Sequence, residues 1–140
     1  MDGHDNETPQ ASWRAAHPSQ RTKRGRRVES LVAAYVELLG WSIVARNARE
    51  GRGEIDLVAR DGREIVFVEV RSRRARGRVS PEESIGAAKR RRLIEAASRW
   101  IGRHGAGSSL CRFDVVAVEL SRAGLMLRHL RGAFVDDQPP

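Results

Sequence analysis

The sequence is poor in cysteine: Cys111 is the one cysteine among 140 residues, so an internal disulfide is excluded. Long apolar runs are missing as well. No stretch approaches the roughly 20 residues that a membrane helix requires, and the N-terminus lacks the apolar segment of a signal peptide. The four histidines show no spacing typical of a zinc site. These absences predict a protein of the reducing cytoplasm that has no membrane partner.

Acidic residues are too few to balance the basic ones. The chain has 26 Lys and Arg residues against 18 Asp and Glu residues, which gives a net charge of +8. A domain this basic suits an acidic partner, and nucleic acid leads the candidates, with DNA before RNA. The length fits one domain with a sizeable hydrophobic core.

Apolar spacing predicts seven elements along the chain. A helix over 23–39 is followed by strands over 41–46, 54–60 and 63–72, a second helix over 80–101, and strands over 110–120 and 125–130. The order α-β-β-β-α-β-β predicts an α/β fold, with a mixed sheet of about five strands flanked by helices. Residues 1–24 are expected to form a disordered N-terminal tail, residues 25–131 the folded domain, and residues 132–140 a flexible C-terminal tail.

Acidic residues gather on one face of the hairpin that the second and third strands form. Alternate residues of a strand point to opposite faces, so Glu54 and Asp56 share a face, and so do Glu69 and Arg71. Asp61-Gly62 is a favoured two-residue turn, and this turn would pair Glu54 with Glu69 and put Asp56 diagonal to Glu69. Directly opposed like charges destabilise a sheet. The three carboxylates therefore predict a bound divalent cation.

This constellation suits phosphodiester hydrolysis with Mg²⁺ or Mn²⁺. A bound Mg²⁺ activates a water and relieves the negative charge of the attacked phosphate, and it takes one or two protein carboxylates while keeping several waters. Asp56 and Glu69 would supply these carboxylates, and Glu54 would contact these ligands without binding the metal itself. Arg71 would lie beside the phosphate and stabilise the charge that builds there.

Basic residues are concentrated just after this hairpin. Nine basic and two acidic residues lie between Arg71 and Arg92. The residues expected to contact nucleic acid are Arg73, Arg74, Arg76, Arg78, Lys89 and Arg90. The alternative interpretation is a solvated basic loop and helix face. Lys89 continues the apolar stripe of the second helix, so it either overlooks a cleft or packs its stem at the edge of the sheet with its amine in water.

In five short segments the chain resembles the PD-(D/E)XK nuclease superfamily, and more closely the bacterial YraN family of nuclease-like proteins. The segments are Gly25-Arg26-Arg27-Val28-Glu29, Gly53-Glu54-Ile55-Asp56-Leu57-Val58-Ala59, Phe67-Val68-Glu69-Val70-Arg71-Ser72-Arg73, Lys89-Arg90-Arg91-Arg92-Leu93 and Arg112-Phe113-Asp114-Val115-Val116-Ala117-Val118. They occur in order within residues 24–131. The resemblance implies a restriction-endonuclease-like core similar to archaeal Holliday-junction resolvases. Because those resolvases work as dimers, it also allows a homodimer.

The resemblance also implies roles for individual residues. Asp56 would be the motif aspartate and Glu69 the second metal ligand, and the carbonyl of Val70 would add a further ligand. Glu29 would be the acid that the first helix brings to the site, although by itself it reads as an ordinary solvated glutamate. Asp114 would have either a structural role or contact with the metal ligands.

The chain departs from the motif at one position, where Arg71 stands in place of lysine. Arginine keeps the positive charge but cannot give up its proton. Hydrolysis survives if the motif lysine acts through its charge. It is slow or lost if that lysine must orient or deprotonate water. Lys89 is a candidate substitute for it. The sequence therefore predicts a metal-dependent endonuclease acting on DNA, including branched or single-stranded forms. The alternatives are a nucleic-acid-binding module with weak or no hydrolysis, and an adaptor for an acidic protein.

Overall fold

The computed structural model describes residues 14–15, 23–74, 85–107 and 110–135. The elements in these residues are β1 (Arg14–Ala15), α1 (Lys23–Leu38), β2 (Ser42–Glu50), β3 (Gly53–Asp61), β4 (Glu64–Arg74), α2 (Ala87–Arg103), β5 (Leu110–Ser121) and β6 (Gly124–Phe134). From α1 onward this is the predicted order α-β-β-β-α-β-β, so the expected α/β fold is confirmed.

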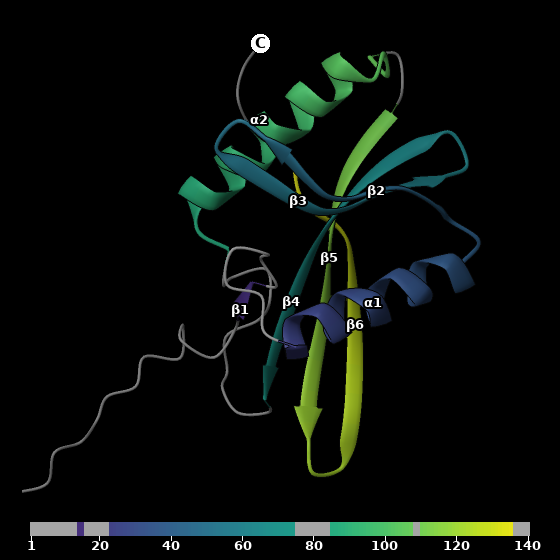
Figure 1. The fold of residues 1–140 in the computed structure, drawn as a ribbon, viewed down its shortest axis with the longest axis vertical. Coiled ribbons are helices and arrows are strands. Elements are labelled where there is room, and N and C mark those ends of the chain that lie inside the picture. The colour runs from purple at the N-terminus through teal and green to yellow at the C-terminus, as the bar shows by residue number, and fades with distance from the viewer. Residues whose placement is uncertain (1–13, 16–22, 75–84, 108–109, 136–140) are drawn as a thin grey trace, which may run out of the picture.

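One sheet runs through the fold. Its strand order is β2-β3-β4-β5-β6, and β1 pairs with β4 beside that path. β4 and β5 are parallel whereas the other neighbours are antiparallel, so the sheet is mixed. Figure 1 shows α2 beside β2 and β3 at the top of the view, and α1 lying across β4, β5 and β6 below. Neither α1 nor α2 has the length and apolar character that crossing a membrane requires.

The side chains of β4 alternate between two hydrophobic clusters. Val66, Val68 and Val70 pack with α1 residues such as Val32, whereas Phe67 packs with Trp100 of α2. This alternation follows from the two-residue period of a strand, and it confirms the predicted division of these residues between the faces. The two helices therefore cover different parts of the sheet from opposite faces, as the α/β pattern requires.

The predicted register of the β3–β4 hairpin is wrong by two residues. Asp61 pairs with Glu64, and the last pair of the ladder is Leu57 with Val68. The turn is thus Gly62-Arg63 instead of Asp61-Gly62, and Gly62 has a φ of 62°, as a turn with glycine at its first central position requires. A two-residue shift leaves every side chain on its predicted face but changes its partner.

Other boundaries differ from the predicted ones. β2 continues to Glu50, so only Gly51-Arg52 remains as a turn where a longer loop was expected. α2 begins at Ala87 instead of at residue 80, and residues 80–84 lie outside the described part of the chain. β6 continues to Phe134, which is buried against Phe113, so residues 132–134 belong to the sheet and not to the tail. Within the expected N-terminal tail, β1 pairs with β4.

Two glycines let the β2–β3 hairpin pack closely on α2. Gly51 has a φ of 59°, which favours glycine in the turn. A Cβ on Gly53 would lie 2.7 Å from the carbonyl oxygen of Arg92 and 2.9 Å from the Cβ of Ala96. Glu50 adds an ion pair to the same contact, because its Oε1 lies 2.7 Å from Nη1 of Arg103. The hairpin is thereby held at a fixed distance from α2.

Candidate active site

Three acidic side chains from three different elements are buried: Glu29 of α1, Asp56 of β3 and Glu69 of β4. Their exposed fractions are 7%, 1% and 3%, respectively. The β3–β4 ladder ends at the pair Leu57 and Val68, so Asp56 and Glu69 are the next residues on the two strands, and they interact electrostatically. The sequence had predicted that the two share a face, and the structure makes them neighbours across the hairpin.

Asp56 occupies a break in the hydrogen-bonded edge of β4. β3 leaves this edge after Val68, and β1 joins it at Arg71 and Ser72, while β5 pairs with the other edge throughout. The backbone N–H of Val70, which lies within this break, donates a hydrogen bond to Oδ2 of Asp56 at 2.8 Å. The side chain of Asp56 thus takes the place of a strand neighbour, which fixes its carboxylate beside Glu69.

The pKa of Asp56 is raised well above its ordinary value. Burial is the largest cause, and the negative charge of Glu69 is the next. The Val70 hydrogen bond and the positive charge of Lys89 act in the opposite direction, while Glu29 raises the pKa further. Glu29 is therefore close enough to Asp56 to act on it electrostatically. Three carboxylates in this setting are costly unless cations accompany them.

Two cations flank Glu69. The Nζ of Lys89 lies 2.7 Å from Oε1 of Glu69, and Nη1 of Arg71 lies 3.7 Å from the same atom. Arg71 is buried, and burial lowers the pKa of its guanidinium although Glu69 and Asp56 raise it. Of the two alternatives for Lys89, the structure supports the one that directs its amine into the site.

The donor set suits a divalent metal only in part. No group of three acidic, histidine or cysteine side chains in the described residues is arranged to hold a metal ion. However, Oε2 of Glu69 is buried and has no hydrogen-bond partner among these residues, and the neighbouring Asp56 offers a second carboxylate. Mg²⁺ needs just one or two protein carboxylates, because waters and substrate phosphate complete its shell. These residues therefore fit a two-carboxylate Mg²⁺ or Mn²⁺ site.

The four described residues among those expected to contact nucleic acid lie in different surroundings. Arg73 is buried and pairs with Glu119 at 3.2 Å. Arg90 donates to the carbonyl of Ile85 and places its guanidinium 5.7 Å from the centre of the Phe134 ring. Arg74 is exposed at the end of β4, whereas residues 76 and 78 lie outside the described part of the chain. Of the expected set, the structure directs Lys89 into the candidate site.

A different group of basic residues lines a cleft beside Glu69. The cleft has a volume of about 530 Å³ and lies between the β2–β3 turn and the first half of α2. Its charged lining residues are Arg49, Arg52, Glu54, Lys89 and Arg92. The expected nucleic-acid-binding residues did not include these three arginines: Arg49 and Arg52 lie between the predicted strands over 41–46 and 54–60, and Arg92 lies on the predicted second helix. The spacing of three between Lys89 and Arg92, which puts both on one helix face, was the available signal.

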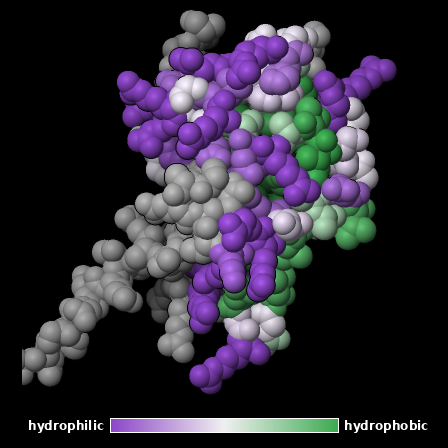
Figure 2. Space-filling model, viewed as in Figure 1, coloured by the Kyte–Doolittle hydropathy of each residue, from purple (hydrophilic) through white to green (hydrophobic). Residues whose placement is uncertain are grey.

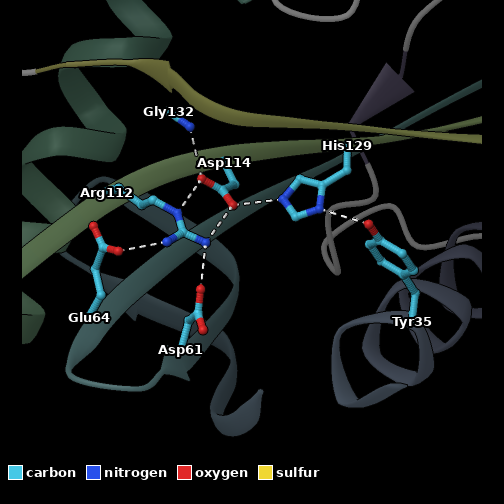
Figure 3. Close-up of polar contacts among 7 residues, drawn as sticks. All are labelled: Tyr35, Asp61, Glu64, Arg112, Asp114, His129 and Gly132. Carbon is cyan, nitrogen blue, oxygen red and sulfur yellow. Dashed lines mark hydrogen bonds and ion pairs between the residues drawn. The ribbon is translucent and has the colours of Figure 1, made fainter. Parts of the chain in front are cut away.

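Asp114 belongs to a separate network on the α1 face of the sheet (Figure 3). Its carboxylate accepts hydrogen bonds from Nε of Arg112 at 3.1 Å and from the backbone N–H of Gly132 at 3.0 Å. Nε2 of His129 lies 2.7 Å from the same carboxylate, and Nδ1 of this ring lies 2.8 Å from the hydroxyl of Tyr35. The geometry assigns Asp114 the structural role among the two that the sequence left open.

The Arg112 guanidinium extends this network to the β3–β4 turn. It lies 2.6 Å from Oε2 of Glu64 and 3.2 Å from Oδ2 of Asp61, as Figure 3 shows. It also lies 5.0 Å from the centre of the Trp41 ring. Four regions of the chain, α1, the β3–β4 turn, β5 and β6, are thus tied to one another. Sequence spacing did not reveal this network, because its members are far apart along the chain.

Comparison with known proteins agrees with the segments that carry the resemblance. The model of the family described as "Uncharacterised protein family UPF0102" matches residues 28–118. A UPF0102 protein of Anaeromyxobacter sp. (strain Fw109-5) is 42% identical over 120 residues, which cover 86% of this chain and 90% of that protein. A UPF0102 protein of Symbiobacterium thermophilum is 46% identical over 107 residues, covering 76% and 91% of the two chains. The chain therefore belongs to the UPF0102 family, the family also called YraN.

Proposed function

We propose that this protein is a Mg²⁺- or Mn²⁺-dependent endonuclease that acts on DNA, including branched or single-stranded forms, in the cytoplasm. The observation that supports the proposal is the pair of buried, interacting carboxylates, Asp56 and Glu69, with two cations at Glu69. These two carboxylates would hold the metal, with the carbonyl of Val70 as a further ligand. When bound, the metal would supply an activated water and relief of negative charge at the attacked phosphate.

The cations of the site have different chemical capacities. Arg71 stays protonated and can grip a phosphate through two N–H groups. Lys89 carries a point charge that can give up its proton in a suitable setting, and its amine is 1.0 Å closer to Glu69 than the nearest guanidinium nitrogen of Arg71, at 2.7 Å against 3.7 Å. Lys89 would therefore take the part of the lysine that the motif has at the position of Arg71. Glu29 would add a third carboxylate beside Asp56, able to hold a water or accept a proton.

One observation favours a second function, nucleic-acid binding without efficient hydrolysis. The contact between Lys89 and Glu69 already neutralises a carboxylate that the metal would need. A metal must therefore compete with an internal ammonium group at this oxygen. If the metal competes poorly, the protein still binds nucleic acid through its basic residues but does not hydrolyse it efficiently.

Cleavage and binding, measured separately, decide between the two functions. Purified protein is incubated with linear, branched and single-stranded DNA with Mn²⁺ or Mg²⁺, beside the Asp56→Asn variant and the control Glu37→Gln, which changes an exposed acid of α1. The endonuclease predicts cleavage that falls about 100-fold or more in Asp56→Asn and is unchanged in Glu37→Gln. DNA binding in EDTA should persist in both variants. If the protein binds DNA but cleaves none of the three forms with either metal, the second function is supported and the endonuclease is refuted.

A further inference from the structure

We infer that the cleft between the β2–β3 turn and α2 binds the phosphodiester backbone of a nucleic acid without reading its bases. Its lining contains four cations and one acid, Arg49, Arg52, Lys89, Arg92 and Glu54, together with Gly51, Gly53 and Leu93. The three arginines are exposed at its rim. Figure 2 shows hydrophilic side chains covering this part of the molecule, around the β2–β3 turn and α2. The cleft is therefore hydrated and strongly positive.

Lys89 links the cleft to the buried carboxylates. Lys89 lines the cleft, and the Nζ of Lys89 lies 2.7 Å from Oε1 of Glu69. Glu54, which precedes Asp56 by two positions on β3, lines the cleft as well. A strand whose phosphates contact Arg49, Arg52 and Arg92 would thus continue toward Glu69. This inference rests on the proposed function, because it supplies the binding surface of the same site.

The backbone on the two sides of the cleft is held together by the packing beneath the cations. The close approach of Gly53 to Arg92 and Ala96, and the ion pair between Glu50 and Arg103, hold the turn against α2. Binding a phosphate chain therefore has to order the arginine side chains but not the backbone that carries them, which costs less entropy than ordering a flexible loop would.

The described residues of the lining include no aromatic ring on which a base could stack and no Asn or Gln side chain for base edges. Arginine and lysine can also bind guanine edges, so a strand without bases distinguishes phosphate binding from base reading. Guanidinium groups also bind the carboxylates of an acidic protein, but the cleft leads to a site proposed for phosphodiester chemistry. We therefore assign it to phosphates, and an acidic polypeptide becomes an outcome of the test.

Binding to a strand without bases tests this assignment. A labelled oligonucleotide with abasic residues and a mixed-sequence strand of equal length are titrated with the protein in EDTA, and fluorescence anisotropy is measured over a range of salt concentrations. The triple variant Arg49→Gln/Arg52→Gln/Arg92→Gln is compared with the control Arg60→Gln/Arg63→Gln/Arg122→Gln, which removes three exposed arginines outside the cleft. Thermal unfolding establishes that both variants remain folded.

We expect the abasic strand to bind the wild type within about threefold of the mixed strand, because phosphate contacts supply most of the affinity. The triple variant should lose roughly 10- to 100-fold in affinity at about 100 mM salt, and the slope of log K against log salt should become shallower by about 2. The control should change much less. Abasic binding that is tenfold weaker, equal loss in both variants, or equally tight binding of polyglutamate would overturn the assignment.

The same set of proteins separates this inference from the proposed hydrolysis. Selective loss of binding in the triple variant without cleavage by the wild type would support the cleft and sink the nuclease. Cleavage that depends on Asp56, with the triple variant binding as tightly as the wild type, would support the nuclease and sink the cleft.

Discussion

The amine of Lys89 lies 2.7 Å from Oε1 of Glu69, which joins the first turns of α2 to the middle of β4. The side chain of Lys89 is 24% exposed and that of Glu69 is 2% exposed, so the pair stands where the site meets the cleft. The amine can therefore serve both the carboxylates and an incoming phosphate. Arg71 is buried more deeply and lies farther from the same oxygen.

The first prediction separates the two cations. Lys89→Gln should lower the single-turnover cleavage rate by about 100-fold or more, the size typical of losing a group that stabilises charge in the transition state. Arg71→Lys should retain most of the rate, because it restores the lysine of the motif and keeps the charge. Mn²⁺ binding, followed by calorimetry, should tighten in Lys89→Gln because the competing ammonium group is gone. A rate that survives in Lys89→Gln but collapses in Arg71→Lys would assign the essential charge to Arg71.

The second prediction concerns the cost of crowding the acids. Asp56→Asn removes one negative charge from a fully buried position near Glu69 and Glu29, and the amide oxygen can still accept the hydrogen bond from Val70. The free energy of unfolding in EDTA should rise by roughly 1–2 kcal/mol, as relief of an unfavourable functional site commonly gives. Urea unfolding measures this, with Glu37→Gln as the control. A less stable Asp56→Asn would mean that the cations more than compensate for the acids.

The third prediction follows from the direction of the pKa of Asp114. Burial by itself raises this pKa, but hydrogen bonds from His129, Gly132 and Arg112 outweigh burial and hold it below the ordinary value of 3.8. The folded state therefore binds the Asp114 proton less tightly than the unfolded state. The resulting stabilisation is complete above pH 3.8 and is lost as the pH falls through the folded-state pKa.

Asp114→Asn should accordingly destabilise the protein by roughly 2–4 kcal/mol at neutral pH. The groups that donate hydrogen bonds to the Asp114 carboxylate would then face a neutral amide, whose nitrogen cannot accept them. The charged and titratable groups around Asp114 are Arg112 and His129, and Arg112 in turn faces Asp61 and Glu64. Urea unfolding of both proteins at several pH values should show the difference shrinking as the pH falls below 3.8. Tyr35→Phe, which removes only the hydroxyl at His129, should cost about 1 kcal/mol. A difference for Asp114→Asn that is constant with pH would refute the assignment.

The fourth prediction tests the close packing of the β2–β3 hairpin on α2. Gly53→Ala puts a Cβ 2.7 Å from the carbonyl oxygen of Arg92, which is backbone and cannot move away by itself. The variant should lose roughly 1–3 kcal/mol of stability. The control is Gly102→Ala, within α2, where a Cβ has open space around it. This variant should gain about 0.5–1 kcal/mol of stability. Thermal and urea unfolding compare the two; equal effects would mean that α2 shifts freely on the hairpin.

Sequence reasoning succeeded where the structure depends on local periodicity. The alternation around Val66, Val68 and Val70 gave the core face of β4, and the same alternation put Glu69 on the opposite face. The predicted pairing within the hairpin was wrong because Asp61-Gly62 and Gly62-Arg63 are both plausible turns. The choice between them shifts the register by two residues, so that Glu69 no longer pairs with Glu54. Residue types near a turn do not fix its position to within one residue.

By itself, the sequence determined the order of the elements, the family, and the face of β4 on which Glu69 lies, because each follows from spacing along a single strand or from short motifs. Only the tertiary structure decided that Asp56 accepts a hydrogen bond from Val70 and interacts with Glu69, that Lys89 reaches Glu69, and that the β2–β3 turn and α2 enclose a basic cleft. These contacts join segments far apart in the chain. They depend on how closely a helix can pack on the sheet, and a backbone period carries no information about that distance.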